Sequence, residues 1–129
     1  MSELELDKKK NQVIDTSLIA KFNSLGFKKL TEIQKQAIPE ILEQKNSLII
    51  APTGSGKTEC SVIPIFSQIK KSKIQGKIKM LYITPLRALN RDVFRRIITY
   101  GEIEGLDIKI RHGDTTPTNR KKISNSPPD

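Results

Sequence analysis

The chain has 129 residues, which is enough for one domain with one hydrophobic core. It carries 23 basic and 14 acidic residues, and its formal charge is +9. Residues 1–69 hold nine basic and eight acidic residues, whereas residues 70–129 hold fourteen and six. Because the excess lies in the second half, we expect a polyanionic partner such as nucleic acid to bind there.

The single cysteine, Cys60, excludes an internal disulfide and a cysteine-based zinc site. A cytoplasmic setting and a packing role for this thiol are therefore expected. No apolar run approaches the 18 residues that a membrane span needs, and the start lacks a basic region followed by an apolar stretch. We expect an unexported chain without a membrane partner.

The first 45 residues predict an arm followed by two helices. Residues 1–14 are charged and poor in apolar groups, so a flexible arm is expected. Apolar residues recur at helical spacing from Asp15, a plausible N-cap, until Gly26. A second helix is expected from Thr31 to about residue 42, with Gln34 completing a capping box. Pro39 lies inside it and predicts a kink or break near Ala37.

The next stretch predicts a strand, a loop and a helix. The apolar residues 47–50 are typical of a buried strand, and residues 58–70 show the apolar spacing of a helix. Between them, residues 51–58 read Ala-Pro-Thr-Gly-Ser-Gly-Lys-Thr, which fits the phosphate-binding loop pattern. Small residues let backbone N–H groups surround a phosphate, Lys57 neutralises its charge, and the Thr58 hydroxyl can hold Mg²⁺.

The remaining residues predict two more strands around one helix. A basic connection over residues 70–79 leads to a buried strand at 79–84 that Pro85 ends. A helix is expected over 86–100, a loop over 101–106, and a strand over 107–111. Strands that alternate with helices predict an α/β fold with a parallel sheet of about three strands. The phosphate loop, Thr84-Pro85 and residues 112–114 would then share the carboxyl edge of that sheet.

With these pieces placed, the sequence resembles the first RecA-like motor domain of superfamily 2 helicases. Residues 26–34 are similar to the adenine-reading segment of DEAD-box helicases, residues 51–58 to motif I, and residues 84–89 to motif Ia. The runs 87–92 and 111–115 favour the large helicase-related branch. The resemblance implies an incomplete RecA-like P-loop NTPase domain over residues 15–129, with a helical adenine-reading segment at 15–45 and a P-loop core at 46–129.

The resemblance also implies an ATP and Mg²⁺ site. Lys57 would contact the β- and γ-phosphates and Thr58 would ligate Mg²⁺, and these two are the expected catalytic residues. Gln34 would read the adenine edge, although its capping-box role is an alternative. The expected ATP-binding residues are Phe27, Gln34, Thr53, Gly54, Ser55, Gly56, Lys57 and Thr58.

In this family, motif Ia and a second loop touch the nucleic-acid backbone. The resemblance therefore implies contacts with DNA or RNA from Thr84, Pro85, Arg87, Arg91, His112 and Gly113. For Arg87 the alternative is an ordinary solvated helix residue, and for residues 112–114 it is a plain turn after a strand.

Two departures from the family pattern bear on activity. Residues 1–21 contain no Phe, Tyr or Trp, so the usual aromatic that stacks on adenine is missing upstream of Gln34. The Asp-Glu box that positions Mg²⁺ and water is also absent, as is a second RecA-like domain with its arginine finger. We therefore expect the N-terminal part of an ATP-dependent helicase, itself almost without ATPase activity. Alternatives are a nucleotide or nucleic-acid binding module, a DEAD-box RNA helicase fragment and, less fittingly, a small P-loop kinase.

Overall fold

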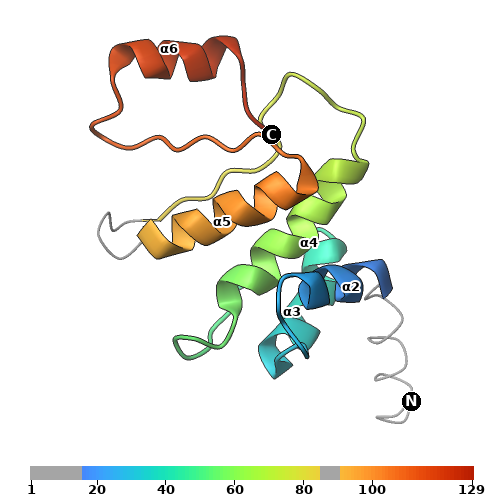
Figure 1. Ribbon diagram of the computed structural model, residues 1–129. Coiled ribbons are helices and arrows are strands. Elements are labelled where there is room, and N and C mark those ends of the chain that lie inside the picture. The colour runs from blue at the N-terminus through green and yellow to red at the C-terminus, as the bar shows by residue number, and fades with distance from the viewer. Residues whose placement is uncertain (1–15, 85–90) are drawn as a thin grey trace. The chain divides into compact units, whose positions relative to one another are not determined.

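The computed structural model describes residues 16–84 and 91–129 (Figure 1). The helices in these ranges are α2 (Thr16–Ser24), α3 (Glu32–Leu42), α4 (Lys57–Lys71), α5 (Arg91–Glu104) and α6 (Pro117–Asn125). The chain forms two compact units, Met1–Gln68 and Ile69–Asp129. The predicted arm and the predicted contacts at Pro85 and Arg87 lie outside the described residues, and the predicted functional division at residue 45 stays a prediction.

Helix α2 is short and amphipathic, as predicted. Leu18 and Phe22 are buried on its inner side. The helix ends where Gly26 adopts a φ of 89°, and the Phe27 N–H donates to the Phe22 carbonyl at 3.0 Å. This six-to-one bond with a left-handed glycine is the arrangement in which a Schellman motif satisfies the last carbonyls. The Phe27 ring then packs edge-on against Phe22, with centroids 5.8 Å apart.

Helix α3 starts with the predicted capping box. Thr31 is the N-cap, its hydroxyl accepts from the Gln34 N–H, and the Gln34 side chain accepts from the Thr31 N–H at 3.0 Å. Of the kink or break predicted near Ala37, the break is wrong, because α3 continues through Pro39 to Leu42. The kink stays a prediction. Pro39 is itself buried, so its packing offsets the one backbone hydrogen bond that the ring removes.

Helix α4 forms the core of the first unit and confirms the helix predicted over 58–70. Cys60, Val62, Ile63 and Phe66 are all buried. Two side-chain hydrogen bonds fasten the earlier helices to it: the Lys21 ammonium donates to the Ser67 hydroxyl at 3.2 Å, and the Gln68 amide donates to the Leu42 carbonyl at 2.9 Å. The second of these satisfies a carbonyl at the end of α3, a group that helices leave unpaired.

Helix α5 runs further than predicted. The sequence predicted a loop from residue 101, but the helix continues to Glu104. Gly101 is buried inside it, and the left-handed residue that ends the helix is Gly105, with a φ of 73°. The Leu106 N–H donates to the Gly101 carbonyl at 2.9 Å. The chain therefore stops the helix with the second of two closely spaced glycines, because only the second reaches the conformation that a C-terminal cap needs.

Helix α6 was not predicted. Its N-cap is Thr116, whose hydroxyl accepts from the Asn119 N–H, and Pro117 is its first residue. Threonine followed by proline is a recognised start signal for helices, so the sequence did contain the cue. The sequence of α6 is mostly polar and shows no apolar periodicity, in keeping with its lack of buried residues. The Thr-Pro start signal therefore had no helical pattern after it.

The predicted sheet is not seen in the described ranges, where no residue belongs to a β-strand. Leu48 and Ile50 are 88% and 82% exposed, and Leu81 and Ile83 are 75% and 82% exposed. A strand exists only as part of a hydrogen-bonded ladder. The segments at 47–50, 79–84 and 107–111 lack such a ladder, so the parallel sheet stays a prediction.

An open pocket lies beside the first of these segments. A cavity of about 340 Å³ is lined by residues from the end of α3, from 44–49 and from α4, including Ile41, Ile49 and Ile65. The segment is thus loosely packed on this side. Within the described ranges, no helix combines the length and apolar character that crossing a membrane requires.

Candidate functional site

The phosphate loop leads directly into α4, as predicted. Lys57 is the first residue of the helix, and Gly54 and Gly56 have φ values of 79° and 87°. Side chains rarely adopt this left-handed conformation, so the two glycines are what allow the chain to turn here. A loop that ends at a helix N-terminus presents unpaired backbone N–H groups and a positive dipole end, which favour a bound anion.

The Lys57 side chain folds back over the loop. Its ammonium donates to the Ala51 carbonyl at 2.5 Å and to the Pro52 carbonyl at 2.6 Å. The structure thus places the positive charge above the backbone that precedes the glycines. A phosphate in the loop would offer this ammonium a charged acceptor in place of two neutral carbonyls, and such hydrogen bonds are about twice as strong.

Ser55 supplies an independent sign that the loop accepts a ligand. Its hydroxyl oxygen is buried, and within the described chain it has no hydrogen-bond partner. A buried hydroxyl without a partner costs about 1–3 kcal/mol. An anion bound between the glycines would offer that hydroxyl an acceptor, so the residues present fit a phosphate group.

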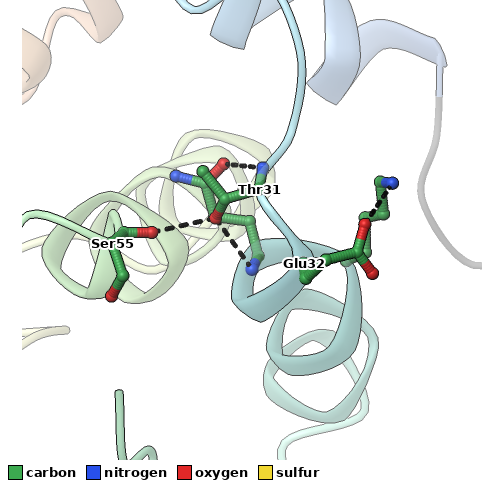
Figure 2. Close-up of polar contacts among 5 residues, drawn as sticks. Thr31, Glu32 and Ser55 are labelled. Atoms are coloured by element: carbon green, nitrogen blue, oxygen red, sulfur yellow. Dashed lines mark hydrogen bonds and ion pairs between the residues drawn. The ribbon is translucent and has the colours of Figure 1, made fainter. Parts of the chain in front are cut away.

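The start of α3 supports the loop from outside. The Thr31 hydroxyl donates to the Ser55 carbonyl at 2.9 Å, and the Gln34 amide donates to the Gly56 carbonyl at 3.3 Å. Figure 2 shows the Thr31 hydroxyl between Ser55 and the first turn of α3, while Glu32 points away toward its ion pair with Lys35. Two consecutive loop carbonyls are therefore held by residues from a distant helix.

Gln34 is enclosed in this network. Only 1% of the residue is exposed, and both its amide oxygen and its amide nitrogen are bonded. A Cβ on Gly56 would lie 2.3 Å from the Gln34 amide nitrogen, so the two fit closely. The capping-box alternative is thus observed, and adenine reading by Gln34 and Phe27 stays a prediction. Sequence reasoning missed the contact with Gly56 because it joins residues 22 positions apart.

The first turn of α4 carries Thr58 and Cys60. The Cys60 thiol donates to the Lys57 carbonyl at 3.0 Å, and burial, aided by nearby Glu59, raises its pKa to about 11. The thiol is therefore protonated at neutral pH and acts as a small packing group, as expected. It shares the Lys57 carbonyl with the Ser61 hydroxyl at 3.3 Å.

A Mg²⁺ site can be tested against the residues present. Thr58 offers one hydroxyl, and the described ranges contain no group of three or more His, Cys, Asp or Glu side chains that could hold a metal. Mg²⁺ at nucleotide sites takes few protein ligands and draws the rest from phosphate and water. Thr58 fits such a single contact.

The predicted nucleic-acid residues that are described lie in the second unit. Arg91 is exposed at the start of α5, Thr84 is partly exposed, and His112 and Gly113 lie in an exposed turn ahead of α6. The turn is held by Arg120, which the sequence analysis did not name. The Arg120 guanidinium donates to the Gly113 and Thr115 carbonyls, each at 2.9 Å.

The loop of residues 51–58, with its two left-handed glycines and with Lys57 at the start of α4, has the sequence pattern and the backbone geometry of a P-loop. Residues 31–129 match the family model described as DEAD/DEAH box helicase. The chain belongs to the DEAD/DEAH box helicase family, which confirms the resemblance read from the sequence.

Relatives of two kinds are similar to this chain. The ATP-dependent helicase Lhr-Core of Sulfolobus acidocaldarius is 34% identical over 125 residues, covering 88% of this chain and 14% of that protein. The one from Methanocaldococcus jannaschii is 34% identical over 118 residues, covering 79% and 14%. The probable ATP-dependent RNA helicase DDX52 of Mus musculus is 38% identical over 99 residues, covering 77% and 16%.

The chain thus spans about one seventh of the length of these relatives. No solved structure gives a significant match.

Proposed function

We propose that this chain is the ATP-binding part of an ATP-dependent helicase that unwinds DNA or RNA duplexes. The observation that carries the proposal is the P-loop itself, with the Lys57 ammonium above it and with the buried Ser55 hydroxyl, which finds no partner among residues 16–84 and 91–129, inside it. Family membership and the names of the relatives support the same activity. ATP would be the ligand, and the resident cation would be Mg²⁺.

Each loop residue has a role that follows from its chemistry. Lys57 would leave its two carbonyls and neutralise the β- and γ-phosphates, while the backbone from Thr53 to Thr58 would surround their oxygens. Bound Mg²⁺ would neutralise phosphate charge, with Thr58 holding it. Gln34 lies on α3, which supports the loop, so an adenine contact by Gln34 would bear directly on the loop's shape. Phe27 lies ahead of that helix and would be the second adenine contact.

The same proposal includes a RecA-like parallel sheet. Residue 129 supports it, because the Asp129 carbonyl accepts from the Lys79 N–H at 3.1 Å while its own N–H donates to the Asp107 carbonyl at 3.0 Å. The starts of two predicted strands are therefore each hydrogen-bonded to the same residue. A second RecA-like domain and nucleic acid are the proposed partners, and a cytoplasmic location is proposed from the single reduced cysteine.

One observation favours a second candidate, a binding module without motor activity. The described residues offer Thr58 but no acidic cluster for Mg²⁺ and the attacking water. A site that holds phosphates without positioning water binds nucleotide and turns it over slowly.

Nucleotide binding by the 129-residue chain tests the proposal. A fluorescent ATP analogue should bind with Mg²⁺ present, and Lys57→Ala should lower its affinity at least about tenfold, since one charge-assisted contact is lost. Lys35→Ala is the matched control, because Lys35 forms an exposed ion pair with Glu32 on α3 and lies outside the loop. Equal affinities for the two variants would contradict the assigned P-loop role. ATP turnover that Lys57→Ala abolishes would show that the site is catalytically complete.

A further inference from the structure

Arg120 spans the exposed turn of residues 112–115 from the first turns of α6. We propose that Arg120 is a positioning residue, which fixes this turn in the shape that contacts a nucleic-acid backbone. The inference rests on the proposed function, because it takes His112 and Gly113 as backbone contacts. Arg120 would thereby have a structural role in that surface, through the hydrogen bonds that its guanidinium donates to the turn.

The turn closes on itself through two hydrogen bonds. The Thr115 N–H donates to the His112 carbonyl at 3.1 Å, and the His112 N–H donates to the Thr115 hydroxyl at 2.9 Å. Every residue from 111 to 114 is exposed. Two bonds among exposed groups are worth little in water, so the turn by itself is weakly held.

Arg120 adds two charge-assisted hydrogen bonds to the turn. Its Nε donates to the Thr115 carbonyl and its Nη2 to the Gly113 carbonyl, each at 2.9 Å. The guanidinium is planar and its donors have a fixed spacing, so the two carbonyls are held at one separation and one angle. Because α6 is capped by Thr116 immediately after the turn, the helix that carries Arg120 begins where the turn ends.

The arrangement suits a phosphate partner. Carbonyl oxygens repel a phosphate, and here two of them are occupied by a permanent cation. Gly113 has no side chain, so a backbone can approach it closely. Residues 109–122 contain five basic side chains, Lys109, Arg111, Arg120, Lys121 and Lys122, against one acidic side chain, Asp114. The surface around the turn therefore has a net positive charge. One of its cations, Arg120, also fixes the conformation of the turn.

Three variants of the 129-residue chain separate positioning from charge. Arg120→Ala removes both, Arg120→Lys keeps the charge but cannot form the fork, and Lys121→Ala removes an exposed neighbouring charge. Binding is measured with fluorescein-labelled oligothymidylate and oligouridylate over a range of salt concentrations. A contact with the backbone should place the two oligonucleotides within a few-fold of each other.

If Arg120 positions the turn, Arg120→Lys should lose affinity about tenfold, the scale of one lost hydrogen bond to a charged group, with an unchanged salt slope. Lys121→Ala should instead lose two- to threefold, with a slope smaller by about 0.7. Amide exchange at residues 113–116 should accelerate in both Arg120 variants and not in Lys121→Ala. Unchanged exchange in α4 verifies that all three variants are folded.

The possible failures are distinct. If the wild-type chain binds both oligonucleotides and Arg120→Lys binds as tightly with unchanged exchange, Arg120 is a simple charge and this inference is wrong. If the wild-type chain binds neither oligonucleotide at low salt, the nucleic-acid half of the proposed function is wrong, and the inference falls with it.

Discussion

The P-loop and the turn of residues 112–115 are both irregular segments ahead of a helix, yet they are held in different ways. The P-loop is supported by Thr31 and Gln34, which lie 22 to 24 positions earlier in the chain. The turn is supported by Arg120, five to seven positions later. Gln34 is 1% exposed, whereas every residue from 116 to 122 is exposed.

This difference in support predicts whether a substitution should affect the stability of the unit, the binding site, or both. A support that is buried and distant in sequence belongs to the core of its unit, so altering it should destabilise the unit as well as the site. A local and exposed support belongs only to its turn, so altering it should change binding with little effect on stability. The variants at Arg120 described above test the local support. The following predictions, in order of expected effect, test the buried support twice and then an ion pair elsewhere in the second unit.

The largest effect is expected at Gly56. Gly56→Ala forces a side chain into a φ of 87° and places its Cβ 2.3 Å from the Gln34 amide nitrogen, so we expect a loss of about 3 kcal/mol of unfolding free energy. Gly54→Ala is the matched control, with a φ of 79° and no atom within 4 Å; it should lose about 1 kcal/mol. Urea unfolding followed by circular dichroism measures both. Equal losses would mean that Gln34 does not confine the loop.

Gln34→Ala should have the next largest effect. It removes the side-chain acceptor of the Thr31 N–H and one of the two donors to the Gly56 carbonyl, which keeps its bond from the Cys60 N–H, and we expect a loss of about 2 kcal/mol. The control is Gln36→Ala on the same helix, where the glutamine is exposed and the change should be within about 0.5 kcal/mol. Fluorescent-nucleotide titration should show weaker binding for the first variant alone. Full stability with reduced ATP affinity would instead identify Gln34 as an adenine contact without a supporting role.

A small effect is expected at Asp129 in the second unit. The hydrogen bond from Lys79, at 2.5 Å, and the bond from the Asp107 N–H hold the pKa of this carboxyl below its ordinary value of 3.8. A lowered pKa stabilises the folded state above pH 3.8, and that contribution is lost as pH falls through the folded value. Asp129→Asn should cost about 0.5 kcal/mol at pH 7.

The pH dependence of the unfolding free energy tests whether the charge of Asp129 causes this effect. The difference between the wild type and Asp129→Asn should shrink as the pH is lowered below 3.8, when measured by urea unfolding at each pH. A difference that is constant with pH would attribute the effect to backbone packing at residue 129 and not to its charge.

The sequence by itself determined the parts of this protein that depend on neighbouring residues. The spacing of residues 51–58 identified the P-loop, Thr31 and Gln34 predicted their capping box, and Gly26 marked the end of α2. Each of these is a local pattern, in which a residue's conformational preference or short side chain acts within a few positions. The same locality explains the error at Gly101, since propensity alone could not tell which of two glycines would take the left-handed cap.

Only the tertiary structure decided what joins distant residues. It brought Gln34 and Thr31 onto consecutive carbonyls of the P-loop and placed Asp129 between Lys79 and Asp107. It buried the Ser55 hydroxyl where no partner lies among the described residues. It also left the apolar segments at 47–50 and 79–84 outside any ladder. The physical reason is that burial and strand pairing depend on which segments meet in space, and no local pattern specifies the partner.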